Sequence, residues 1–306
     1  MRKLLIGLGV LVVVAVAAAF VGPLFVPTDS IKADVAAEVR KATGRTLSID
    51  GDLSFRLLPA PGVSADGVRL SNAAQGTGPD MISLDGATVE VALFPLLSGN
   101  VQVNRIVLRE PVILLEQFAD GTNNWTFAPE QEDTSGAAGN GASSNGRGSA
   151  APAVRFDNVQ IVDGTVIYAT PDTRERIEDI DMTLGAGSLT GPFRAEGSLM
   201  ARGFDIDLNA AVGELVADKA TPINARISTA GARIDYSGVM SGTGESARVG
   251  GQIEVRADDI AAMVASLSDG PAPASLKGKA LELDGTVAAT ADTVSVDDLA
   301  LRLGED

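Results

Sequence analysis

The amino-acid sequence predicts a mainly β protein. We expect an N-terminal transmembrane helix and a short amphipathic helix, then an extended, curved antiparallel β-sheet with a repeating, groove-like build and one further short helix. Three observations predict this fold. Beyond residue 46, apolar residues recur at every second position, the period of a half-buried strand. These runs are bounded by Gly, Pro, Asp and Asn, which mark turns. Only one later segment, residues 258–267, has helical spacing.

Residues 4–26 form an apolar run of 23 residues without a charge. As a helix it would measure roughly 34 Å, enough to cross a hydrocarbon core of ~30 Å. Arg2 and Lys3 precede it, so the positive-inside rule predicts a cytoplasmic N-terminus and an exported body. The alternative is a cleaved signal peptide, because small residues at 15–19 could form a cleavage site. The anchor residues that we expect to face lipid are Leu4, Leu11, Val14, Phe20, Leu24 and Phe25.

The segment after this run predicts an amphipathic helix over residues 28–43. Ile31, Val35, Val39 and Ala42 recur at intervals of four, four and three and would form one apolar stripe. Gly44 stands where a glycine commonly ends a helix. We expect the stripe to pack on the first part of the sheet.

Strand patterns occupy most of the remaining chain, and one small motif recurs among them. Residues 46–57 predict either one long strand or two strands that meet at a bend near Gly51. The alternation slips at Asn104 and Arg105, which predicts a bulge. An acidic or Asn residue precedes an apolar–polar–apolar triplet at several places, for example at Asp66 and Asp157, and we interpret it as a turn residue that opens a strand.

The domain organisation follows from composition. Residues 1–27 form the anchor, 28–128 the helix and first β region, and 153–306 a second β region. Residues 129–152 are rich in Gly, Ser and Ala and predict a flexible linker. The last strand pattern ends without a following partner strand, so we expect the second region to be incomplete at its C-terminus.

The composition excludes most catalytic chemistry. The chain has 306 residues, a net charge of −16, and neither His nor Cys. These absences remove imidazole bases, thiol nucleophiles and the usual zinc sites. The acidic balance argues against nucleic acid as a partner. We predict no enzymatic activity, no metal and no cofactor, although an unrecognised enzyme is a distant alternative.

Three stretches resemble the AsmA family of bacterial envelope proteins: residues 43–55 after the helix, residues 57–72, and residues 89–127, which end in an Asp-Gly-Thr-Asn-Asn-Trp segment. The resemblance implies a single-pass inner-membrane protein with a periplasmic body and a role in outer-membrane biogenesis. It also implies likeness to bridge proteins whose curved sheet carries phospholipid in an apolar groove. Family members are typically longer, and the resemblance supplies no catalytic residues.

The apolar face of the first β region is open to two interpretations. It could be an ordinary core, which needs a second layer across it. Alternatively, it could be an open groove for phospholipid, which the resemblance favours. In the core interpretation, the protein is a non-catalytic scaffold or regulator of outer-membrane protein assembly, in contact with other envelope proteins. The candidate lipid-contacting residues are Leu47, Ile49, Leu53, Phe55, Leu57, Val89, Val91, Leu93, Ile106 and Leu108.

Overall fold

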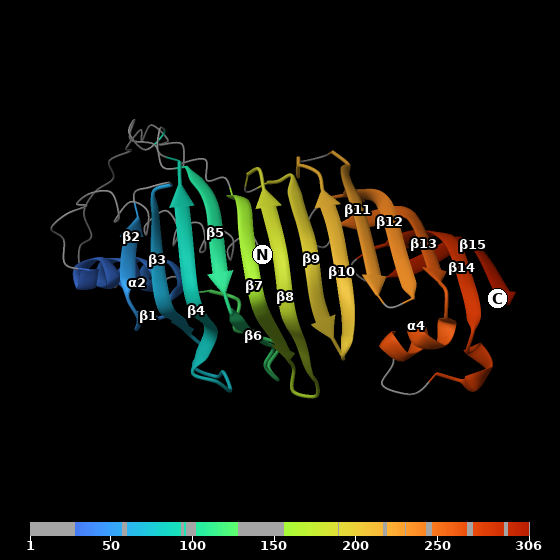
Figure 1. Ribbon diagram of the computed structural model, residues 1–306, viewed down its shortest axis with the longest axis horizontal. Coiled ribbons are helices and arrows are strands. Elements are labelled where there is room, and N and C mark those ends of the chain that lie inside the picture. The colour runs from blue at the N-terminus through green and yellow to red at the C-terminus, as the bar shows by residue number, and fades with distance from the viewer. Residues whose placement is uncertain are drawn as a thin grey trace, which may run out of the picture.

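A computed structural model describes residues 28–56, 60–92, 95, 102–127, 156–188, 190–216, 219–229, 231–242, 247–267, 272–290 and 293–305. Within these ranges the chain forms one 15-stranded sheet, a long twisted ribbon with a helix near each end (Figure 1). The helices are α2 (Thr28–Thr43) and α4 (Ile260–Leu267), and a 3-10 turn spans Ala274–Leu276. The first strands are β1 (Leu47–Ile49), β2 (Leu53–Arg56), β3 (Gly62–Ser71), β4 (Asp80–Val91), β5 (Val103–Arg109) and β6 (Val112–Glu116). The later strands are β7 (Phe156–Ala169), β8 (Arg174–Ala186), β9 (Phe193–Ala201), β10 (Phe204–Val212), β11 (Thr221–Thr229), β12 (Ala232–Ser241), β13 (Arg248–Ala257), β14 (Lys279–Ala289) and β15 (Val294–Glu305).

Helix α2 has the predicted bounds and buries the predicted stripe except for Ala42, which is half-buried. Ile31, Val35 and Val39 are buried and pack against Leu47 of β1 and Leu70 of β3. The helix ends where Gly44 adopts a φ of 70°, and its N–H donates to the carbonyl of Arg40 at 2.7 Å. This is a left-handed C-terminal cap, which glycine adopts without steric cost.

Helix α4 begins two residues later than the sequence predicts. The Asp259 carboxylate accepts a hydrogen bond from the N–H of Ala261 at 2.8 Å, so Asp259 caps the helix and does not join it. Ile260 in the first turn is buried, as is Ala257 at the end of β13.

The chain bends sharply between β1 and β2, so the two-strand alternative is confirmed. Both strands pair antiparallel with β3. The bend is at Gly51, where a Cβ atom would lie 2.7 Å from the carbonyl oxygen of Asp66. Only glycine allows the two backbones to approach this closely.

The sheet is antiparallel, as predicted, except at one place. Strand β7 runs parallel to both β5 and β6, whereas the other strand pairs are antiparallel. Strands β5 and β6 are two segments of one interrupted strand, because both pair with β4 on one side and β7 on the other. The interruption is at Glu110, which has a φ of 47°, and Pro111. A parallel neighbour requires a long connection, and β7 begins only at Phe156, far along the chain from the end of β6 at Glu116.

The prediction that the recurring acidic motif forms a turn that opens a strand is wrong. In four of its copies the residue lies inside a strand at a bulge, where the register with a neighbouring strand shifts. Asp179 and Asp298 have positive φ values of 50° and 53°, a conformation that Asp and Asn tolerate better than most residues. Bulges strengthen the local twist of the sheet. The bulge predicted at Asn104 is confirmed, because Val91 pairs with Val103 and Glu90 with Arg105.

The anchor prediction concerns residues outside the described ranges. Leu4, Leu11, Val14, Phe20, Leu24 and Phe25 all belong to that undescribed part. Among the described helices, none combines the length and hydropathy needed to cross a membrane.

Strand β15 forms one edge of the sheet, and we expect its amide hydrogens to exchange quickly. It pairs with β14 alone among the described strands, so its outward N–H groups have no strand partner. Hydrogen exchange followed by mass spectrometry should show faster exchange in residues 294–305 than in β3, which lies between two paired neighbours. Equal protection in β15 and β3 would contradict this and would mean that another strand covers the edge.

Candidate functional site

The strand register carries a row of apolar residues across the sheet on one face. Paired residues in neighbouring strands point to the same side, so a row of pairs can be followed across the sheet. The row is apolar throughout and consists of Val63, Val89, Ile106, Val159, Leu184, Ala195, Ala210, Ala225, Tyr236 and Ile253. This apolar face therefore continues without a break from the first β region into the second.

Helix α2 covers the apolar face at one end of the sheet and leaves a cavity of about 280 Å³ between helix and strands. This apolar cavity is lined by α2, β1–β6 and Phe127, and every lining residue except Lys32 and Thr43 is apolar. The hydroxyl of Thr43 donates within the helix to the carbonyl of Val39 at 2.6 Å. The volume is close to the lower end of small-molecule sites, ~300 Å³.

The predicted groove residues fall into four groups. Leu47, Ile49, Leu53, Val89, Ile106 and Leu108 line the apolar cavity. Val91 is sealed in a small core with Val103 and Ile106, and only 2% of it is exposed. Phe55 is 43% exposed, and Leu57 and Leu93 lie outside the described residues.

Sequence reasoning missed several residues of the cavity. Ile82 and Leu84 of β4 and Val63 and Val68 of β3 line it as fully as the predicted residues do. Their alternation was visible in the sequence and could have identified them. The packing of Ile31, Val35 and Val39 on the sheet was predicted, but no local pattern specifies that a cavity remains between the helix and the strands.

Beyond the cavity, no second sheet covers the apolar face in the described part of the chain. Most apolar side chains of β9–β14 are only half-buried. At the far edge, apolar side chains of β15 are exposed by half or more: Val294, Val296, Leu299, Leu301 and Leu303. Exposed apolar surface of this extent marks an interaction site more often than a free surface.

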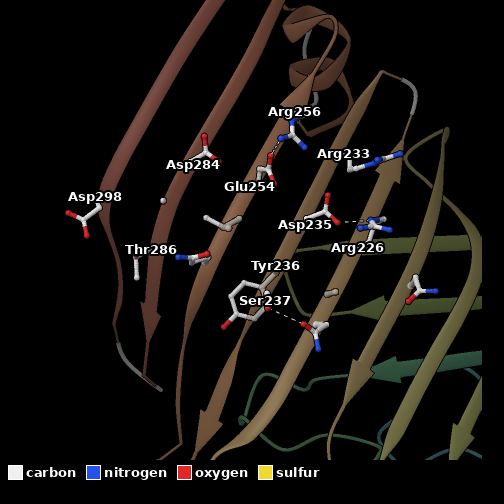
Figure 2. Close-up of a pocket in the computed structure, with 16 residues that line it drawn as sticks. Arg226, Arg233, Asp235, Tyr236, Ser237, Glu254, Arg256, Asp284, Thr286 and Asp298 are labelled. Atoms are coloured by element: carbon white, nitrogen blue, oxygen red, sulfur yellow. Dashed lines mark hydrogen bonds and ion pairs between the residues drawn. The ribbon is translucent and has the colours of Figure 1, made fainter.

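The opposite face is polar, and it is hollowed over β10–β14 (Figure 2). The hollow has a volume of about 860 Å³ and includes a row of paired polar residues: Asn209, Arg226, Asp235, Glu254 and Asp284. Thus the apolar cavity lies under α2, whereas the hollow of the second β region lies on the polar face.

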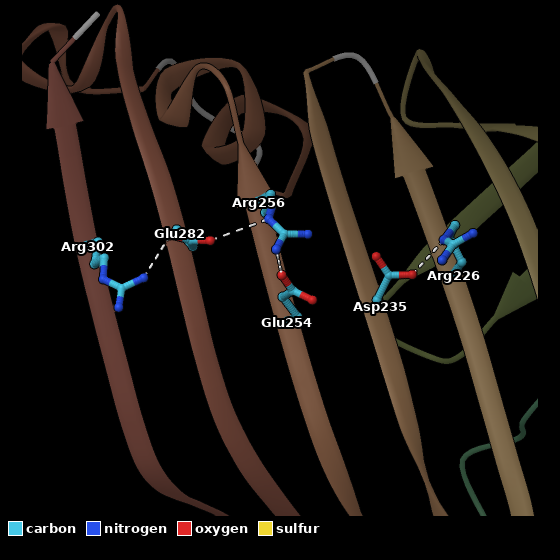
Figure 3. Close-up of polar contacts among 6 residues, drawn as sticks. All are labelled: Arg226, Asp235, Glu254, Arg256, Glu282 and Arg302. Carbon is cyan, nitrogen blue, oxygen red and sulfur yellow. Dashed lines mark hydrogen bonds and ion pairs between the residues drawn. The ribbon is translucent and has the colours of Figure 1, made fainter.

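Ion pairs cross the strands of this polar face (Figure 3). The Arg226 guanidinium lies 2.5 Å from the Asp235 carboxylate, and Glu282 bridges Arg256 and Arg302 at 3.5 and 3.1 Å. All of these side chains are solvent-accessible, so each pair contributes little to stability. Within the described residues, no cluster of acidic side chains has the arrangement of a metal site.

A buried polar network lies beside β6. The Glu116 carboxylate is 2% exposed and accepts hydrogen bonds from Asn72 Nδ2 at 2.7 Å and from the N–H and hydroxyl of Thr77. Asn124, which is fully buried, donates to the carbonyl of Leu114 and to Asn72 Oδ1. Burial raises the pKa of Glu116, but the hydrogen bonds from Thr77 and Asn72 outweigh that effect and hold it below its ordinary value. The network fastens two loops to the sheet.

Together, these features define a class of protein: a long one-sheet β protein with a continuous apolar face and a helix-covered apolar cavity. The chain belongs to the AsmA family, whose family model matches residues 1–304. It is similar to Protein AsmA of Escherichia coli (strain K12), with 31% identity over 115 residues. That alignment spans 38% of this chain and 18% of the relative, so the chain matches less than a fifth of that protein's length. No solved structure matches the chain.

Proposed function

We propose that this protein is a non-catalytic envelope protein that holds phospholipid acyl chains against its apolar face, with the apolar cavity under α2 as the principal site. The observation that carries this proposal is the cavity itself, a partly open apolar space bounded by α2 and β1–β6. Removal of an acyl chain from water contributes about 0.8 kcal/mol per buried CH₂. The half-exposed apolar face of β9–β14 offers a continuation for chains that extend beyond the cavity.

The cellular setting is part of the proposal. Membership of the AsmA family is consistent with a role in the envelope and in outer-membrane biogenesis. The apolar run of residues 4–26, preceded by Arg2 and Lys3, supports a single-pass inner-membrane anchor with the body in the periplasm. In that position the protein would take its lipid from the membrane that anchors it.

The test is site-specific photo-crosslinking of the full chain in a Gram-negative host. A benzophenone amino acid replaces Leu84, which lines the apolar cavity, or Ser83, which is the next residue and lies on the opposite face. We expect phospholipid adducts, detected by mass spectrometry, at position 84 and few at position 83. Equal yields at both positions, or adducts with protein alone at position 84, would contradict lipid binding.

A second candidate function is a scaffold that contacts other envelope proteins. The observation that favours it is β15, an edge strand with exposed apolar side chains and an unpaired row of backbone groups. Such an edge can accept a strand from a partner protein. Photo-crosslinking from position 299 would distinguish the two functions, because a scaffold gives protein adducts there.

A further inference from the structure

Lys32 is the exception in the apolar cavity. It is the sole ionisable side chain among the residues that line this space, and it is half-buried in the first half of α2. An ammonium group in such surroundings loses part of its hydration and needs polar partners. A lysine that merely kept α2 soluble would point away from the sheet, as the exposed Lys41 does.

Among the described residues, the Lys32 ammonium has a hydrogen-bond partner but no carboxylate partner. Lys32 Nζ donates to the carbonyl oxygen of Gly51 at 2.6 Å, at the bend between β1 and β2. An ammonium has three donors, so two remain after this bond. No ion pair joins Lys32 to a carboxylate of the described residues. Two acidic side chains flank Gly51 on the bend: Asp50 is engaged by Arg69, and Asp52 forms no ion pair with Lys32.

We propose that Lys32 binds the phosphate of an anionic phospholipid whose acyl chain occupies the apolar cavity. This assignment rests on the proposed function and specifies the class of ligand: an amphiphile with a negative head group. The Gly51 carbonyl holds the ammonium in place before the ligand arrives, so little side-chain freedom is lost on binding. The two free donors then meet the phosphate oxygens in a charge-assisted contact.

The test measures binding of two lipids that share their acyl chains and glycerol backbone, of which only one carries an anionic phosphate head group. The full chain, held in phosphatidylcholine nanodiscs, is titrated with dioctanoyl phosphatidylglycerol or with uncharged dioctanoylglycerol, and displacement of an apolar fluorescent dye gives each Kd. For Lys32→Gln we expect the Kd for phosphatidylglycerol to rise about tenfold, while the Kd for dioctanoylglycerol stays unchanged. Lys32→Arg keeps the charge and should stay within about threefold of wild type.

Lys41→Gln is the matched control, because Lys41 belongs to the same helix but does not line the cavity. Its two Kd values should equal those of wild type, and thermal melting should show that all variants fold. Equal binding of phosphatidylglycerol by wild type and Lys32→Gln, with dioctanoylglycerol still bound, would overturn the head-group assignment and leave the lipid site standing. If wild type bound neither lipid, the proposed function would fail together with this inference.

Discussion

Replacement of Val91 with glutamate should destabilise the protein by on the order of 4 kcal/mol. Val91 is 2% exposed and packs with Val103 and Ile106, so a carboxylate there would be sealed among apolar side chains. Among the described residues, that core contains no cation to compensate it, and protonation would still leave an unpartnered polar group. The expected loss is a large share of a typical domain's stability of ~5–15 kcal/mol.

Phe55→Glu is the matched variant, because the sequence places Phe55 and Val91 in the same alternating apolar set. Phe55 is 43% exposed, so its carboxylate would remain hydrated and should cost less than about 1 kcal/mol. Thermal melting and urea unfolding of the full chain measure both effects. Val91→Ala separates the loss of volume from the burial of charge and should be milder than Val91→Glu. Similar melting temperatures of Val91→Glu and Phe55→Glu would contradict the burial of Val91.

Removal of the Glu116 carboxylate should have the second large effect on stability. Glu116→Ala would leave one N–H of the buried Asn72 Nδ2 without its acceptor, although Nδ2 still donates to the carbonyl of Gly78, and would also remove the acceptor of the more exposed Thr77 N–H. An unsatisfied buried donor costs about 1–3 kcal/mol, so we expect a loss of about 2 kcal/mol in the free energy of unfolding. Glu178→Gln is the control, because that side chain is 45% exposed and takes part in a surface ion pair. It should leave stability nearly unchanged.

The lowered pKa of Glu116 predicts that the stability of the protein depends on pH. The folded-state pKa of Glu116 is lowered from its ordinary value of 4.5, so the ionised form stabilises the fold. Its contribution is fully present above pH 4.5 and is lost as the pH falls through the lower folded-state pKa. As the pH is lowered from 6, the free energy of unfolding should therefore fall less steeply in Glu116→Gln than in wild type. Parallel profiles would show that Glu116 does not titrate with the fold.

Local patterns determined most of the elements of this protein. The stripe of Ile31, Val35 and Val39 with Gly44 after it specifies α2, because helix formation and capping depend on neighbours within one or two turns. The alternation of apolar residues specifies the strands and the apolar face, since side chains of a strand point to opposite sides in turn. The slip at Asn104 marked a bulge for the same reason. The resemblance to the AsmA family also came from short segments in a characteristic order.

Tertiary structure decided what depends on distant parts of the chain. The parallel run of β7 beside β5 depends on a crossover whose path no local pattern encodes. The Asp and Asn motif suits turns and bulges equally, so only pairing with the next strand shows which one forms. Val91 and Phe55 look alike in the sequence, yet one is sealed and the other exposed, because burial is set by what packs across the sheet. Lys32 acquires its role in the same way: the placement of α2 on the sheet brings its charge to an apolar cavity.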